Sequence, residues 1–517
     1  HMQPGRQRTA SFVPVVTIGL LCAVGVFFLA PAAAFFDSGE LATTAVELGV
    51  PHPTGFPIFN LSGHLFSLLP FGGGALRVNL LGMCATCCAT VALLVAAGCV
   101  LETSALASIV ALAGCGLLCL AAPSVLRHAR AAEIYPLVWL HAAGCLAAWL
   151  QFGGYRRAAV LAGLLGIGSM LHAESLLFAG VFGLFALIAA LRTEGAPSLK
   201  LLIAGVVVTA LGVLGVVYLP LAANRPAAFS WGDTSHWPEV WAHLTAASIR
   251  TAYRDEMGSG LYASALGLAA GLWRDIGVVV GAVVVGVVVA ARRDWRRFTA
   301  IAAIVVIDVG YSVLINPMGL RDEQCGNIAA LGLLALAALG LAETGRALVG
   351  RDKRWLWPVA VALLAVGVGR ASVAVEQRPN GELRAADGLV HRTVDAIAPG
   401  GLAIVASDHV ASLCSHAQIA EGSRPDALCA PAVFTRDRRM LRVLARRGER
   451  GFGAAREVLQ SATDRAAMAN AMAAWVRPAI RAKALAWELG SAAEDAQILS
   501  HWLPGFPTGR VVADKPT

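Results

Sequence analysis

Long apolar runs, separated by short polar breaks, make up most of the chain as far as Val373. A transmembrane helix needs about 20 predominantly apolar residues, and the first run, Ser11–Ala34, is long enough. The run Ala158–Leu191 is too long for one crossing, so we expect it to break at the polar residues His172 and Glu174. Including these, the pattern predicts about 11 transmembrane helices. The other eight runs are Val78–Val100, Ala105–Leu126, Glu133–Leu150, Leu199–Leu221, Ile276–Ala291, Phe298–Ile315, Ala329–Leu348 and Trp355–Val373.

The composition agrees with this pattern. Only 14% of the 517 residues are charged, and the mean hydropathy is +0.67. Soluble domains carry about 25% charged residues, so the composition excludes a soluble enzyme and indicates an all-α polytopic membrane protein. His1 and Met2 have the pattern of a cloning remnant, and we expect the membrane domain to cover residues 3–373.

The chain changes character after Val373. The run Ala403–Ser407 is short and apolar and leads into Asp408 and His409, which predicts a buried strand, and the rest is rich in Ala and Arg. We expect residues 374–517 to form a small extracytoplasmic domain, either α/β or mostly helical. Cys414 and Cys429 lie in this polar part, and in an oxidising compartment they can form a disulfide.

Basic residues between the apolar runs predict the orientation in the membrane. Lys and Arg favour cytoplasmic loops, so the net charge of +8 indicates orientation and not nucleic-acid binding. With a cytoplasmic N-terminus, the Arg-rich breaks at 156–157, 192–200, 292–297 and 346–354 all lie inside. The unusual polar stretches then share the outer side, which predicts one site at the outer face of a bacterial inner membrane. These stretches are Asp37–Arg77, Arg127–Tyr135, His172–Glu174, Asn224–Glu256 and Asn316–Asn327.

Two carboxylates follow the first apolar run directly. Asp37 and Glu40 are costly to keep beside hydrocarbon, so they require an explanation. Asp37 can cap a helix that starts at Ser38, with Glu40 completing a capping-box-like pair. Alternatively, one or both carboxylates carry chemistry. The residues alone leave both explanations open.

The segment that contains these carboxylates resembles a known family. DSGELATTAVELGVPHPTGFPIFNLSGHLFSLLPFGGGALRVNLL, which starts at Asp37, is similar to the signature of domain of unknown function 2723 (DUF2723). This family of GT-C superfamily membrane glycosyltransferases includes eukaryotic transmembrane O-mannosyltransferases that modify receptor ectodomains. Arg127–Leu137 and Tyr218–Thr245 also resemble segments of that family. The resemblance implies a GT-C-like fold and transfer of a sugar, with mannose expected, to a protein or glycan acceptor.

The expected chemistry assigns roles to particular residues. The extracytoplasmic space holds no nucleotide sugars, so the donor is expected to be a polyprenyl-phosphate-linked sugar. An inverting displacement needs a base, for which we select Asp37, with Glu40 holding the acceptor or the sugar. Arg side chains can stabilise the leaving phosphate with two parallel hydrogen bonds. The candidates for that role are Arg130, Arg127, Arg77 and Arg321.

Several of these residues also have purely structural explanations. Arg77 can be an anchor at the membrane surface, and Glu133 can simply pair with Arg130. Trp231 can be an interfacial aromatic residue or can stack on a sugar ring. The remaining candidates for substrate binding are His52, His64, Glu133, Tyr135, His172, Trp231, Asp233 and His243.

The histidines follow no recognised metal-ligand spacing, so no cofactor is expected, although a divalent metal stays open. Membrane lipid is the remaining expected partner. A first alternative is the same architecture with another lipid-linked donor and a lipid or wall-polymer acceptor. A second is a non-enzymatic transporter of lipid-linked sugar. Transporters place ionisable residues near the membrane midplane, whereas this chain gathers them at one interface, which favours the enzyme.

Overall fold

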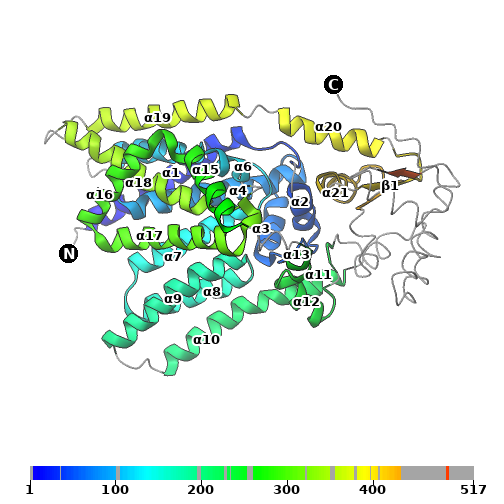
Figure 1. The fold of residues 1–517 in the computed structure, drawn as a ribbon, viewed down its shortest axis with the longest axis horizontal. Coiled ribbons are helices and arrows are strands. Elements are labelled where there is room, and N and C mark those ends of the chain that lie inside the picture. Colours follow the sequence, from blue (N-terminus) through cyan, green and yellow to red (C-terminus); the bar gives the residue numbers. More distant parts are fainter. Residues whose placement is uncertain are drawn as a thin grey trace.

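The computed structural model describes residues 4–34, 37–99, 105–194, 199–225, 230–232, 234–252, 260–320, 323–349, 356–377, 381–395, 397–405, 408–431 and 485–487. Helices dominate this part of the chain (Figure 1). Within these described ranges, seven helical segments are long and apolar enough to cross a membrane. They are α4 (Gly74–Ala97), α9 (Ala173–Glu194), α10–α11 (Ile203–Ala223), α15–α16 (Leu261–Arg293), α17 with η4 (Trp295–Ile315), α18 (Asn327–Val349) and α19 (Leu356–Gln377).

A bent pair of helices is a candidate for an eighth span or a re-entrant loop. Helices α5 (Ala105–Leu120) and α6 (Pro123–Ala129) meet the same criterion only together, and they are bent by 90°. Pro123 lies in the first turn of α6, where a missing backbone N–H is tolerated. The same residue prevents α5 from continuing, because proline cannot donate the hydrogen bond that a helix interior needs. The sequence pattern treated this region as one straight run, and the structure corrects that prediction.

These helices confirm an all-α multi-pass membrane protein. Every predicted run contains a helix, but α1 (Pro4–Gly25), α7 (Tyr135–Gln151) and α8 (Gly154–Ser169) do not meet the spanning criterion. The structure therefore supports seven or eight spans within the described residues, and the predicted count of eleven goes beyond them. The predicted break at His172 is present, because α8 ends at Ser169 and α9 begins at Ala173.

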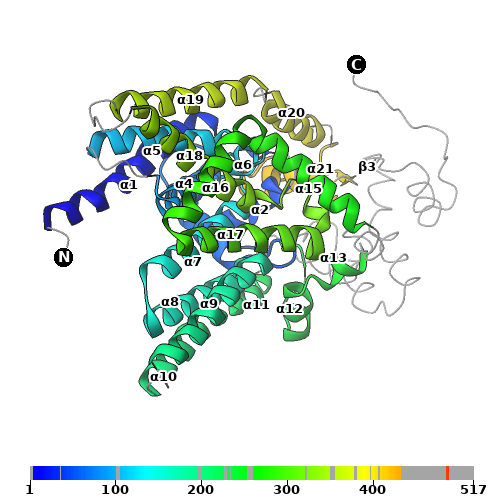
Figure 2. The same ribbon diagram turned by 60° about the vertical axis from the view of Figure 1, so that its left-hand side comes forward.

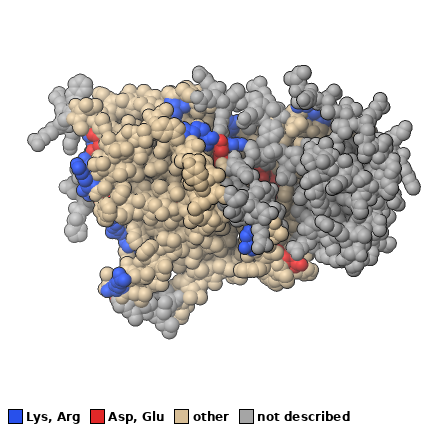
Figure 3. All heavy atoms as spheres, viewed as in Figure 1, with Lys and Arg blue, Asp and Glu red and all other residues tan. Residues whose placement is uncertain are grey.

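Close helix contacts use glycine. A side-chain carbon at Gly286 of α16 would overlap the backbone of Leu336 in α18, and one at Gly340 would overlap Ala282. Only small residues let two backbones approach so closely, as is common between helices in membranes. Helix α18 is consequently buried over most of its length. On the outside of the bundle, Figure 3 shows a broad face without charged side chains.

The basic loops gather at one end of the bundle. Glu343, near the end of α18, pairs with Arg346 and lies 2.6 Å from Arg293, at the end of α16. Arg296, which follows Arg293, donates to the carbonyl of Trp149 near the end of α7 at 3.0 Å. The ends of α7, α16 and α18, where the sequence placed inner loops, therefore lie together.

The opposite end carries two short helices, α2 (Ser38–Glu47) and α3 (Pro57–Ser67). Helix α3 buries Phe59 on one side and exposes Leu61 and Leu65 on the other. Figure 1 places α2 at the far end of the bundle from the N-terminus, and Figures 1 and 2 both show it beside α21 (Asp408–Ser415). The first polar segment and the C-terminal part of the chain therefore meet there.

The C-terminal part contains a small parallel sheet in the order β2-β1-β3. Strand β1 (Leu402–Val405) confirms the predicted strand and pairs with β2 (Leu428–Pro431) and β3 (Leu485–Trp487). Helices α20 (Gly381–Asp395) and α21 flank β1 in the sequence, which fits the α/β alternative. Cys414 and Cys429, which the sequence left open as a disulfide pair, are separate buried thiols in this structure.

Candidate functional site

Asp37, Glu40 and His52 form a compact cluster. One ligand atom from each lies within 4.8 Å of the other two. Glu40 is almost fully buried, and its Oε1 accepts a hydrogen bond from the backbone N–H of His52 at 2.5 Å. The Nδ1 atom of His52 lies 3.2 Å and 3.3 Å from the two carboxylate oxygens. The structure thus brings together both predicted carboxylates and one predicted histidine.

The chain reversal after α2 brings His52 to Glu40. The helix ends at Glu47, and Leu48 adopts a left-handed backbone with φ of 53°. The carbonyl of Gly49 then accepts from Tyr218 Oη at 2.7 Å and from Asn60 Nδ2 at 3.0 Å. These contacts hold the returning segment against α3 and α11 (Tyr218–Ala223), so His52 faces the start of α2.

Asp37 does not cap α2 with its side chain. It occupies the N-cap position, but within the described residues its carboxylate makes no capping hydrogen bond. Its backbone is helical (φ −78°, ψ −6°), whereas capping residues typically have an extended backbone. Glu40 does not complete a capping box either, because its carboxylate binds His52. Both side chains are therefore directed into the cluster.

Gln324 joins the cluster although the sequence analysis did not select it. Its Nε2 donates to Asp37 Oδ2 at 3.4 Å, and its Oε1 accepts from Tyr135 Oη at 3.0 Å. The only signal in the sequence was that Gln324 lies in the polar stretch Asn316–Asn327. The amide orients the Asp37 carboxylate and links it to Tyr135, a predicted site residue.

Aromatic and imidazole rings enclose one side of the cluster. The ring of His172 lies 5.7–6.2 Å from the rings of Phe56, Tyr135 and Tyr311. The ring of His52 contacts Phe56 at 5.1 Å and Trp231 at 6.2 Å. His172 thus packs among protein rings, and its Nδ1 accepts from the N–H of Glu174 at 3.4 Å, while Trp231 stands edge-on to His52.

The three histidines around the cluster differ in charge. Burial alone lowers the pKa of His52, but the carboxylates of Glu40 and Asp37 outweigh it and raise the pKa to about 10. Burial lowers the pKa of His172 and of His243 to about 4. At neutral pH, therefore, His52 is a cation between two carboxylates, while His172 and His243 are neutral.

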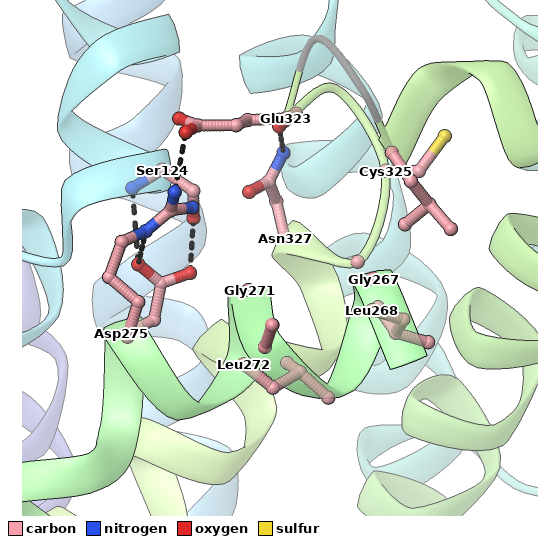
Figure 4. Close-up of a pocket in the computed structure, with 13 residues that line it drawn as sticks. Ser124, Gly267, Leu268, Gly271, Leu272, Asp275, Glu323, Cys325 and Asn327 are labelled. Carbon is pink, nitrogen blue, oxygen red and sulfur yellow. Dashed lines mark hydrogen bonds and ion pairs between the residues drawn. The ribbon is translucent and has the colours of Figure 1, made fainter. Parts of the chain in front are cut away.

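Two arginines share one carboxylate near the cluster. Glu323, next to Gln324, lies 3.1 Å from Arg127 and 2.5 Å from Arg274. Arg274 and Glu323 line a cavity of about 260 Å³ between α15 (Leu261–Ile276), α6 and the turn at residues 323–327 (Figure 4). The turn therefore presents Gln324 to Asp37 and Glu323 to the two guanidinium groups. Arg127 was predicted, and Arg274 was not.

Two buried carboxylates were also missed. Asp308 accepts hydrogen bonds from the N–H groups of Gly326 and Ala329, where α18 begins. Asp275 accepts from the N–H and the hydroxyl of Ser124, in the first turn of α6. Both satisfy backbone donors at helix starts, where a negative charge is favoured. Their contacts support a structural role.

The other predicted residues that the structure describes make contacts outside the cluster. Arg77 donates to the carbonyls of Ser67, Leu69 and Gly73. His64 contacts the carbonyls of Ala45 and Val46, and His243 contacts that of Pro51 at 2.9 Å. Glu133 is buried, 3.9 Å from His128, and Arg130 is also buried. Arg321 and Asp233 lie outside the described residues.

The described residues contain one group suited to a metal ion, namely Asp37, Glu40 and His52. Two carboxylates and an imidazole are ordinary ligands for a divalent cation. His52 must lose its proton before it can bind a metal, and its raised pKa opposes that. His64 and His243, considered with His52 in the sequence, are engaged with separate backbone carbonyls.

The three residues of the cluster lie in a segment that matches a model of a known protein family. A family model described as the protein O-mannosyl-transferase TMEM260 N-terminal domain matches residues 37–194. The match begins at Asp37 and includes Glu40, His52 and His172, whereas Gln324 lies beyond it. The matching model carries the O-mannosyl-transferase description, and the narrower DUF2723 assignment stays a prediction.

A curated relative supports the same likeness. The protein O-mannosyl-transferase TMEM260 of Mus musculus is 26% identical to this chain over 424 residues. The aligned part covers 75% of this chain but only 58% of the mouse protein. The chain is therefore similar to protein O-mannosyl-transferases in a membrane region that contains the cluster.

Proposed function

We propose that the chain is a GT-C-type membrane glycosyltransferase that moves mannose from a polyprenyl-phosphate donor to a protein or glycan acceptor. The observation that carries this proposal is the arrangement of Asp37. Its carboxylate is oriented by Gln324, is not used for capping, and lies beside the Glu40–His52 pair. The similarity to O-mannosyl-transferases supports the reaction class.

The reaction is a single displacement that inverts the configuration at the anomeric carbon of the sugar. The hydroxyl oxygen of the acceptor attacks the anomeric carbon of the sugar, and the Asp37 carboxylate accepts the proton of that hydroxyl. The bond from that carbon to the donor phosphate breaks, and polyprenyl phosphate leaves with an additional negative charge. Glu40 and the cationic His52 fix the position of the acceptor or the sugar, and Trp231 borders the same space.

Arginines stabilise the leaving phosphate. Arg127 and Arg274 converge on Glu323 beside the cavity, so two guanidinium groups already face one anionic group there. Guanidinium groups match the geometry of phosphate oxygens. Arg130 and Arg321 remain further candidates for this role. Arg77 is the weakest candidate, because backbone carbonyls occupy its guanidinium group.

The site is proposed to face the extracytoplasmic side of a bacterial inner membrane. The cluster lies at the end of the bundle opposite the gathered arginines, and positive loops favour the cytoplasm. The α/β part then lies on the same outer side as the site. Residues 3–373 and 374–517 are the proposed domains.

One assay tests the proposed function against its alternatives. Purified protein in lipid nanodiscs is incubated with labelled polyprenyl-phosphate mannose and a panel of secreted proteins. Labelled acceptor is the expected result. Transfer only from another lipid-linked sugar, or only to lipid or polymer, would replace the donor or acceptor named here. Translocation of the labelled lipid in proteoliposomes without transfer would instead support a transporter.

A further inference from the structure

The start of α2 is capped by a residue from the far end of the described chain. The first N–H groups of a helix have no partner within it, and the N-cap side chain normally supplies one. Here the N–H of Glu40 donates to Ser412 Oγ at 2.6 Å. Ser412 belongs to α21 and is 372 positions away from Glu40. The hydrogen bond that Asp37 would ordinarily accept is therefore already formed.

The contact between α2 and α21 is close and buried. An added carbon at Gly39 would lie 2.7 Å from the carbonyl carbon and oxygen of Ser412, so only glycine permits this approach. Thr43 donates to the carbonyl of Gly39 at 2.6 Å, and therefore its hydroxyl must accept from His416 Nδ1 at 3.4 Å. Ser412 and His416 are both buried. The α21 segment is thus fixed to the helix that carries Glu40.

We propose that Ser412 takes over the capping of α2 and thereby keeps the Asp37 carboxylate available for proton transfer. This positioning role rests on the proposed function of Asp37 as the base. Asp and Ser are comparable capping groups, so an Asp at the N-cap position competes for the same amide. When Ser412 holds the amide, Asp37 keeps its helical backbone and its contact with Gln324. Without Ser412, Asp37 turns to the amide and leaves the site.

Kinetics test the first consequence. In Ser412→Ala the kcat of transfer is expected to fall about five-fold, because capping by Asp37 draws the base from its position. The KM for the donor stays unchanged, and Ser412→Thr, which keeps a hydroxyl, restores kcat. The matched control is Ser415→Ala on the same helix, whose buried hydroxyl has no hydrogen-bond partner among the described residues. A kcat of Ser412→Ala equal to that of Ser415→Ala would overturn the proposal.

A stability cycle tests the competition without using activity. Ser412→Ala is introduced into the wild type and into Asp37→Ala, and unfolding temperatures are measured in the full-length protein. In the wild type Asp37 replaces the lost cap, whereas in Asp37→Ala the Glu40 amide stays unsatisfied. The drop in unfolding temperature is therefore expected to be several degrees larger in the Asp37→Ala background. Equal drops would overturn the inference, even if transfer by the wild type confirms the proposed function.

Discussion

Asp37 can be tested directly, because capping and proton transfer make opposite forecasts for one substitution. Asn caps a helix about as well as Asp, but it cannot accept the proton of the acceptor. We expect Asp37→Asn to fold, to melt within a few degrees of the wild type and to bind the donor. Its turnover at saturating substrates should fall by about 10²- to 10⁴-fold. Near-normal turnover would remove Asp37 as the base.

The control for this experiment lies on the same helix. Glu47→Gln makes the same change from carboxylate to amide at the other end of α2 and should transfer sugar normally. Glu40→Gln should be measured beside both, because a larger loss in that variant would exchange the roles of the two carboxylates.

The charge of His52 predicts how stability depends on pH. Its pKa is about 10 in the folded protein and about 6.5 when unfolded, because the carboxylates stabilise the cation. The stabilisation is fully present below about pH 6.5 and is lost as the pH rises through about 10. We expect the difference in unfolding temperature between the wild type and His52→Gln to shrink over this range. A difference that grows toward pH 10 would contradict the cationic assignment.

The individual site residues differ in how far sequence could identify them. Asp37 and Glu40 could be found because carboxylates beside an apolar run carry a clear energetic cost. Gln324 and Ser412 are uncharged, so they carry no comparable signal. They reach Asp37 and Glu40 only through tertiary contacts, across 287 and 372 positions. Only the folded chain reveals them.

Arg77 and Arg127 have different contacts, so we expect loss of Arg77 to reduce stability and loss of Arg127 to reduce transfer. Arg77 connects the end of α3 with the start of α4 through backbone carbonyls, so Arg77→Gln should lower the unfolding temperature but not transfer per folded molecule. Arg127 faces Glu323 beside the cavity, so Arg127→Gln should lower kcat/KM for the donor by at least about ten-fold. Donor titrations and thermal unfolding of both variants separate the two effects. The reverse pattern would assign the phosphate to Arg77.

Helix boundaries show what a local pattern can and cannot predict. Length and apolarity are local properties, so the run Val78–Val100 corresponds well to α4 (Gly74–Ala97). The 90° bend after α5 escaped prediction because Pro123 lies inside a continuous apolar run. Strand β1 could be predicted from five residues, but its parallel partners, including β3 some 80 positions later, could not.

Orientation can be tested across the whole protein with two exposed positions. Trp237, at the start of α12 (Trp237–Leu244), is 61% exposed and is expected outside, whereas Thr193, near the end of α9, is expected inside. In intact cells an impermeant maleimide should label Trp237→Cys at once and Thr193→Cys only after permeabilisation. The parent protein controls for labelling of native thiols. The opposite result would reverse the proposed topology.

The hydrogen bond between Glu40 and Ser412 also determines when the site is completed during synthesis. The ribosome makes α2 early and α21 only after hundreds of further residues, because synthesis proceeds from the N-terminus. Loop closure over this separation costs entropy that is repaid only when α21 docks. A nascent chain can therefore insert its first membrane spans, with Asp37 and Glu40 already in place, before the hydrogen bond to Ser412 has formed. Maturation of the centre is then a late event in biogenesis that depends on docking of the C-terminal part.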